Sequence, residues 1–243
     1  MNNRIDLSPL TRLTMTFDHE LDLDSTGELG DAAYAGYKEQ HQLSIVKRDS
    51  MAKTLVLVNT VLFLLINGKG WKIPGMDADI STLPAIKEIA LLYSSLCFFF
   101  LCAVFVNEQC YAGLVGQYGI RKSRGSSIDP DFVNASKFHY DFFLKIYRPK
   151  MNIWGIDFFE SRRAFAIFSQ IILAMTVSIL LLFPAIHFLL IFLAALEVSE
   201  NDWIIWGKVF YLSAIALVNI SGAVLVLALF KDFSFDLFKS NET

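Results

Sequence analysis

The stretch AFAIFSQIILAMTVSILLLFPAIHFLLIFLAAL, residues 164–196, contains no Asp, Glu, Lys or Arg. A charge near the centre of a bilayer costs about 3 kcal/mol or more, so a run of this composition is typical of a membrane span. As one straight helix it would be about 50 Å long, which exceeds the hydrocarbon thickness. We predict a tilted span kinked at Pro184, with a re-entrant hairpin around Phe183 and Pro184 as the alternative.

Three further ranges lack charged residues: 54–68, 89–107 and 209–230. The last two have the roughly 20 residues that a spanning helix needs, and Lys53 and Lys69 can extend the first by snorkelling. The whole chain is 54% hydrophobic and 19% charged, with a mean hydropathy of +0.47. These patterns predict an all-α membrane protein with four transmembrane helices.

The basic residues predict how these helices are oriented. All but four of the 21 Lys and Arg residues lie on one side of the predicted spans, and the exceptions are Lys69, Lys72, Lys87 and Lys208. Basic loops stay in the cytoplasm, so we expect both termini to be cytoplasmic in a cell membrane, most simply the bacterial inner membrane. The net charge of −3 argues against nucleic acid as a partner.

The same reasoning divides the chain into five segments. Residues 1–50 form a cytoplasmic arm and a helix leading into the first span, and 51–107 form spans one and two with a short outer loop. Residues 108–163 form a cytoplasmic helical segment, 164–231 form spans three and four with a short acidic outer loop, and 232–243 form a cytoplasmic tail. Within the central segment, Asp129 and Pro130 predict the start of a helix that Pro149 ends.

The N-terminal segment has weaker signals. Residues 1–24 show no clear periodicity and are interpreted as a loose arm, whereas the capping-box spacing of Ser25 and Glu28 predicts a helix that continues into the first span. Aromatic and basic side chains in this segment and in the turn after the second span are candidates for cytoplasmic interaction. They are Tyr34, Tyr37, His41, Arg121, Lys122 and Arg124.

The stretch Asp22-Leu23-Asp24-Ser25-Thr26 resembles the DxDxT signature of haloacid-dehalogenase-type phosphotransferases. That chemistry needs a surrounding parallel sheet, which the short distance to the first span does not allow. The stretch also resembles the start of an EF-hand loop, but Ala33 stands where the bidentate Glu belongs. We interpret it as a solvated acidic arm, or alternatively as a segment that docks on the basic turn at 121–124. No catalytic residue, metal or cofactor is predicted.

Polar residues within the spans are the remaining candidates. Asn219 lies at the midpoint of the fourth span and shares a helical face with Ala216 and Ala223, so the three form a candidate oligomer seam or pore lining. The other intramembrane polar candidates are Asn59, Ser94, Ser95, Gln170, Thr176 and His187. Hydrogen-bonded helix packing is the alternative for the whole set. For His187, the alternatives are a structural role and proton sensing.

We expect a non-enzymatic multi-pass protein that forms a homo-oligomeric, channel-like pore or perturbs the membrane, controlled through its cytoplasmic helices. The layout is similar to that of small four-span membrane effectors of bacterial nucleotide-signalled defence systems. The alternative is a membrane-anchored sensor or accessory subunit that recruits a partner through residues 108–162. The expected partners are the lipid bilayer, further copies of the chain, and a soluble cytoplasmic protein or small signalling ligand. The spans contain no acidic or basic residue, which argues against a proton-coupled transporter.

Overall fold

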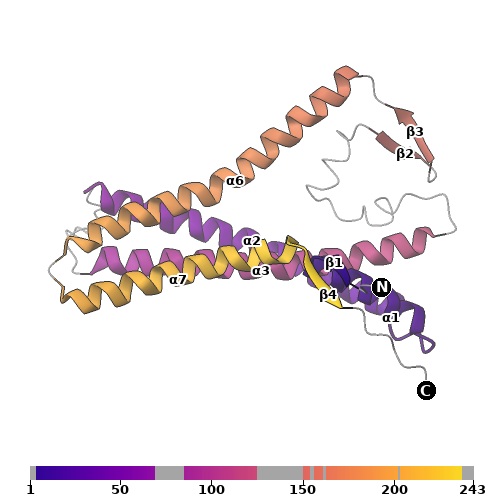
Figure 1. Cartoon of the computed structure of the whole chain (residues 1–243), viewed down its shortest axis with the longest axis horizontal. Coiled ribbons are helices and arrows are strands. Elements are labelled where there is room, and N and C mark those ends of the chain that lie inside the picture. Colours follow the sequence, from indigo (N-terminus) through magenta and orange to yellow (C-terminus); the bar gives the residue numbers. More distant parts are fainter. Residues whose placement is uncertain are drawn as a thin grey trace, which may run out of the picture. The chain divides into compact units, whose positions relative to one another are not determined.

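The computed structural model describes residues 4–68, 85–124, 150–153, 156–160, 163–201 and 203–236. Four helices are long and apolar enough to cross a membrane (Figure 1): α2 (Asp31–Ile66), α3 (Ile86–Ser123), α6 (Arg163–Ser199) and α7 (Ile205–Phe230). The predicted class, an all-helical membrane protein with four spanning helices, is confirmed. The helix predicted between Asp129 and Pro149 lies outside the described residues.

Helix α6 runs from Arg163 to Ser199 with Pro184 inside it. Proline removes one backbone hydrogen bond, but its fixed φ is compatible with helical geometry, so the helix continues on both sides of it. The chain therefore does not turn back at Phe183 and Pro184, and the re-entrant alternative is wrong. A single helix of 37 residues also matches the length of the uncharged run from which it was predicted.

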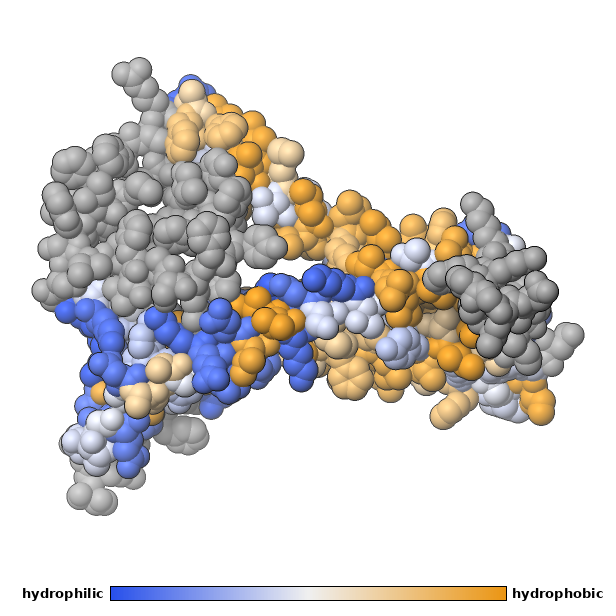
Figure 2. All heavy atoms as spheres, turned by 180° about the vertical axis from the view of Figure 1, so that it is seen from behind, coloured by the Kyte–Doolittle hydropathy of each residue, from blue (hydrophilic) through white to orange (hydrophobic). Residues whose placement is uncertain are grey.

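The chain divides into two compact units. The bundle unit, as we call it, contains Met1–Arg12, Gln42–Gln109 and Ala185–Thr243, and the aromatic unit contains Leu13–His41 and Cys110–Pro184. Helices α2, α3 and α6 each contribute residues to both units. Figure 2 shows hydrophobic residues covering much of the visible surface of the bundle helices.

The core of the bundle unit is one cluster drawn from all four helices: Leu62, Leu91, Leu190, Ile191, Ala194, Val198 and Ile215. Helix α7 buries Ile215, Asn219, Gly222 and Leu229, whose spacings of four, three and seven residues place them along one face. Gly222 permits this close packing, because a Cβ at this position would lie 3.2 Å from the Cα of Phe99 on α3. The small residue that matters for packing of α7 inside the chain is thus Gly222.

Two short antiparallel pairs of strands accompany the helices. In the bundle unit, β1 (Arg4–Leu7) pairs with β4 (Phe233–Asp236), so that Arg4 is opposite Asp236 and Leu7 is opposite Phe233. In the aromatic unit, β2 (Lys150–Ile153) pairs with β3 (Ile156–Glu160). None of these strands was predicted from the sequence, because four or five residues carry too little alternation to be recognised. The β1–β4 pair places the two ends of the described chain side by side.

The interpretation of residues 1–24 as a loose arm is wrong, because Pro9–Leu23 forms helix α1. Its start has a recognisable signature: the Ser8 hydroxyl accepts a hydrogen bond from the Thr11 backbone N–H at 3.1 Å, and Pro9 occupies the first helical position. Phe17 and Leu21, four residues apart, are buried. The predicted helix start at Ser25 is also wrong, since α2 begins at Asp31.

Candidate functional site

Each of the four spanning helices places one polar side chain in a shared network inside the bundle unit. Asn59 comes from α2, Ser94 from α3, His187 from α6 and Asn219 from α7. Ser94 and His187 are 0% exposed and Asn219 is 2% exposed. We call these four residues the four-helix network.

The network is a continuous chain of hydrogen bonds. The Ser94 hydroxyl donates to Asn59 Oδ1 at 2.6 Å. The Asn59 side-chain amide lies beside His187 Nδ1, with Nδ2 at 3.2 Å and Oδ1 at 3.3 Å. On the other side of the ring, His187 Nε2 is 2.9 Å from Asn219 Oδ1, and Asn219 Nδ2 donates to the Ile215 carbonyl at 2.9 Å.

The partners assign the donor and acceptor of each bond. Because Asn219 Nδ2 donates to a backbone carbonyl, its Oδ1 is the acceptor and His187 Nε2 must carry a proton. In a neutral imidazole Nδ1 is then an acceptor, which the N–H of Asn59 satisfies while Asn59 Oδ1 accepts from Ser94. Every member is therefore satisfied when His187 is neutral.

The surroundings of the imidazole are aromatic. The ring of Phe98 stacks on His187 with 4.4 Å between centroids and an interplanar angle of 18°, and Phe188 meets the imidazole edge-on. Protonation of Nδ1 would turn the Asn59 amide, because Oδ1 would have to accept and Nδ2 would then face Ser94. The network can thus hold the four helices together with one set of donors and acceptors. A proton on His187 Nδ1 would exchange the donor and acceptor roles of the Asn59 side chain.

Charged groups lie at the two ends of the bundle unit. Arg48 donates from Nη1 to both carboxylate oxygens of the buried Glu108, at 2.7 and 2.8 Å. At the other end of α3, the buried Glu88 accepts from Asn201 Nδ2 at 2.6 Å. Glu88 and Glu108 are separated by roughly 20 residues, or about 30 Å of helix, which is the thickness of a hydrocarbon core. The four-helix network lies between these two levels.

The other intramembrane candidates do not join the network. The Ser95 hydroxyl donates to the Leu91 carbonyl, and the Thr176 hydroxyl donates to the Ile172 carbonyl, each at 2.9 Å within its own helix. Gln170 is exposed. Ala216 is exposed and Ala223 is half-buried, whereas Asn219 points into the bundle, so the three predicted seam residues do not share one environment.

The candidate residues Tyr34 and Tyr37 lie in an aromatic cluster with Phe17 and Tyr118 in the aromatic unit. Phe17 and Tyr34 have ring centroids 5.3 and 4.9 Å from that of Tyr118, and Tyr37 meets Phe17 edge-on at 5.7 Å. The Tyr118 hydroxyl donates to the Leu29 carbonyl. This cluster packs α1, α2 and the end of α3 together, and it accounts for the burial of Tyr34. His41 is also buried.

The basic candidates Arg121, Lys122 and Arg124 pair with acidic residues of the same unit. Arg121 contacts Asp22 at 2.7 Å, Arg124 contacts Asp18 at 2.7 Å, and Lys122 pairs with Asp31. The acidic segment therefore docks on residues 121–124, which is the alternative interpretation stated above, although Arg121–Ser123 form the end of helix α3 and not the predicted turn. A hydrogen bond from Gln117, followed by the one from Arg124, holds the pKa of Asp18 below its ordinary 3.8.

Asp24, the second aspartate of the DxDxT-like stretch, organises the loop between α1 and α2. Its Oδ1 accepts from the backbone N–H groups of Thr26, Gly27 and Glu28, and its Oδ2 accepts from that of Leu29 at 2.8 Å. The Leu29 bond is the main cause that lowers the pKa of Asp24 below 3.8. Because Asp24 caps this loop, with Gly27 at a φ of +76°, the Ser25 capping box does not form.

Among the residues described, no group of three His, Cys, Asp or Glu side chains could hold a metal ion. In comparisons with known proteins, no family model, no curated protein and no solved structure matches this chain.

The sequence analysis named all four members of the network but not their contacts. Asn59 and His187 are 128 positions apart, and His187 and Asn219 are 32 apart. The pairing of Arg48 with the buried Glu108 was not predicted, although Glu108 directly follows the uncharged run 89–107 and a carboxylate there needs a partner.

Proposed function

We propose that this protein is a non-enzymatic membrane-embedded sensor or accessory subunit, in which helix packing inside the bilayer is coupled to a polar helical region that engages a partner. One observation carries the proposal. Asn59, Ser94, His187 and Asn219, one from each spanning helix, hydrogen-bond to one another within a single chain. They are consequently satisfied without lining a pore or meeting a second copy.

The helices themselves supply the coupling. Asn59 and Ser94 of the four-helix network lie on α2 and α3, and the same two helices carry Tyr34 and Tyr118 of the aromatic cluster. A helix is stiff over this length. We propose that a displacement of α2 relative to α3 at the network is transmitted along both helices. We propose that residues 108–162 present the surface that recruits the partner.

The proposed orientation has both termini and residues 108–162 in the cytoplasm of a cell membrane. The excess of Lys and Arg on that side supports it. The pairing of β1 with β4 supports the part of this proposal that places both ends on one side, since an even number of spans returns the chain to its starting side. Reporter fusions after Gly125 and after Thr243 should both report the cytoplasm, and an external signal from either fusion would contradict the orientation.

Hydrogen exchange in detergent micelles or nanodiscs tests the coupling. His187→Leu breaks the network, and it should speed exchange of the amides in 13–37 and 110–121 as well as in the bundle. Thr176→Val is the matched control on the same helix, because its hydroxyl bonds only to Ile172. If His187→Leu leaves the aromatic unit as protected as in the parent protein, the sensor proposal fails.

A homo-oligomeric pore-forming or membrane-perturbing component is the second candidate, and one observation favours it. The consecutive residues Ile179, Leu180, Leu181 and Leu182 are all exposed, and at 3.6 residues per turn they cover the whole circumference of α6. We propose that an oligomer would pack through this part of α6. Native mass spectrometry and dye leakage from vesicles decide between the candidates, since a leak from a multimer that Leu181→Arg abolishes would favour the pore.

A further inference from the structure

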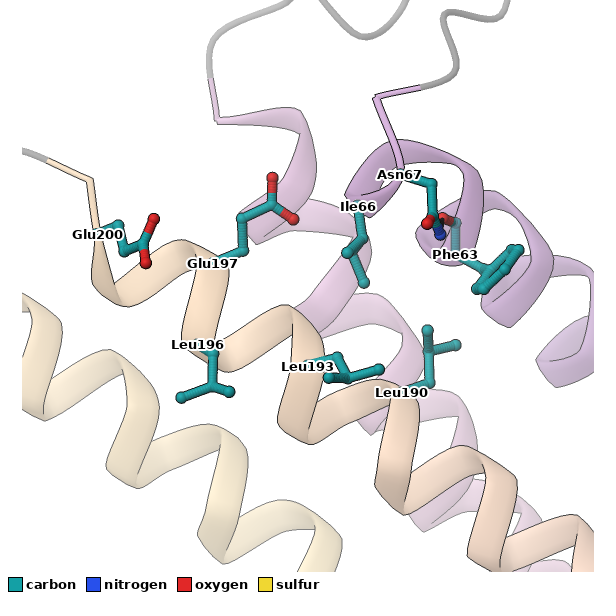
Figure 3. A pocket seen from close by; sticks show the side chains of 8 residues that line it. All are labelled: Phe63, Ile66, Asn67, Leu190, Leu193, Leu196, Glu197 and Glu200. Atoms are coloured by element: carbon teal, nitrogen blue, oxygen red, sulfur yellow. Dashed lines mark hydrogen bonds between the residues drawn. The ribbon is translucent and has the colours of Figure 1, made fainter.

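A groove of about 380 Å³ lies in the bundle unit, between the ends of α2 and α6 (Figure 3). Apolar side chains line most of it, including Phe63 and Ile66 from α2 and Leu190 and Leu193 from α6. Glu197 and Glu200 lie at one end. The groove is thus amphipathic along its length, with a hydrocarbon surface that leads to two carboxylates.

Of the two carboxylate oxygens of Glu197, one has a partner among the described residues and the other does not. One oxygen, Oε1, pairs with Lys87 of α3. The other, Oε2, is buried and accepts no hydrogen bond within the described part of the chain. Glu200 adds a second negative charge one helical turn further on. Lys208 donates to the Ser199 carbonyl beside Glu200 at 3.0 Å, but no ion pair to the Glu200 carboxylate is found among the described residues. This end of the groove can therefore accept a further cationic hydrogen-bond donor.

We propose that this groove binds a phospholipid whose headgroup carries a protonated primary amine, with an acyl chain along the apolar lining and the ammonium between Glu197 and Glu200. Glu197 is the first charged residue after the uncharged run 164–196, so the carboxylates lie at headgroup depth in the proposed orientation. A primary ammonium offers three N–H donors to the carboxylates of Glu197 and Glu200, whereas a quaternary ammonium offers none. The inference goes beyond the proposed function and does not depend on it.

Native mass spectrometry of the delipidated full chain tests the proposal. The protein is titrated with phosphatidylethanolamine, phosphatidylcholine and phosphatidylglycerol that have identical acyl chains. We expect the ethanolamine lipid to bind about tenfold more tightly than the choline lipid, as the gain of charge-assisted hydrogen bonds predicts. The anionic glycerol lipid should bind no better than the choline lipid.

Variants show where the preference arises. Glu197→Gln with Glu200→Gln should abolish the preference for ethanolamine, and Glu200→Gln alone, which leaves the Lys87 pair intact, should reduce it. Leu193→Trp should weaken ethanolamine-lipid binding by filling the apolar part. Glu20→Gln on α1 is the matched control for lost charge, because Glu20 is exposed and remote in sequence from the groove.

Three results would overturn the proposal. Equal affinity for the ethanolamine and choline lipids would remove the role of the amine. An undiminished preference in the Glu200→Gln protein and in the double variant would place the amine elsewhere. Displacement of the lipid by millimolar free ethanolamine would mean that the site takes the amine without a lipid chain.

Discussion

The two units hold themselves together with different polar chemistry. In the bundle unit, the interior contacts are neutral hydrogen bonds among Asn59, Ser94, His187 and Asn219, and the ion pairs lie at its ends. In the aromatic unit, ion pairs bridge side chains that water reaches, such as Lys122 with Asp31, whose side chain is 85% exposed. A neutral network costs little to bury, whereas surface charges need no burial at all.

This contrast shows that the contribution of a polar contact to stability depends on whether it lies in an apolar interior or in contact with water. An exposed ion pair is screened and typically contributes less than 1 kcal/mol, so the aromatic unit relies on its ring cluster for most of its cohesion. A buried pair or network is costly to break, because the partner left behind keeps its unmet hydrogen bond. Perturbations of equal chemical size should therefore have unequal effects in the two units.

The largest effect should come from the Arg48–Glu108 pair. Arg48→Leu removes the guanidinium that donates to both oxygens of the buried Glu108 carboxylate, and we expect a loss of about 3–5 kcal/mol in unfolding free energy, seen as a lower thermal midpoint in detergent. Arg48→Leu with Glu108→Leu should recover most of the loss. As the matched change, Arg124→Leu breaks the exposed pair with Asp18 and should cost far less; equal losses would remove the contrast between the units.

Asn219→Leu should cost about 1–3 kcal/mol, because it leaves His187 Nε2–H without an acceptor in the interior. The native mass should not change, since Asn219 is bonded within its own chain. Ser213→Leu, at an exposed position on the same helix, is the control. A shift of the Asn219→Leu protein toward smaller native species would instead restore Asn219 to the predicted oligomer seam.

Gly222→Ala should destabilise the bundle by about 1–2 kcal/mol through overpacking, because the added Cβ would lie 3.2 Å from the Phe99 Cα and 3.4 Å from Cys102 Sγ. Gly207→Ala, on the same helix, meets nothing within 4 Å and should be neutral or slightly stabilising. Thermal unfolding of both variants in one detergent measures the difference. Equal midpoints for the two proteins would mean that α7 can move away from α3 at no cost.

The smallest effect is a pH dependence confined to the aromatic unit. The pKa of Asp18 is lowered below its ordinary 3.8, first by the hydrogen bond with Gln117 and then by that with Arg124. A lowered folded-state pKa means that its stabilisation is present above pH 3.8 and is lost as the pH falls through the folded value. Amide exchange in 13–23 should rise in that window, and Asp18→Asn should remove the dependence. If the pH profile of the Asp18→Asn protein is unchanged, another carboxylate causes the pH dependence of amide exchange.

Much of the architecture follows from composition and charge spacing. The uncharged runs identified all four spanning helices, because a bilayer excludes charge over a fixed thickness whatever the helices contact. The same reasoning predicted a continuous α2 and singled out Asn219 and His187 as residues that need partners. Helix α1 was also predictable from Ser8, Pro9 and the spacing of Phe17 and Leu21, although the analysis overlooked that pattern.

What the sequence could not reveal is which polar groups meet. Ala216, Asn219 and Ala223 share a face by spacing alone, but the tertiary structure buries Ile215, Asn219, Gly222 and Leu229 instead, because the rotation of α7 is set by its contact with α3. Asn219 meets His187 only once the helices have packed. Spacing along one helix determines its possible faces, whereas the choice among them depends on neighbours that are distant in sequence and adjacent only in the fold.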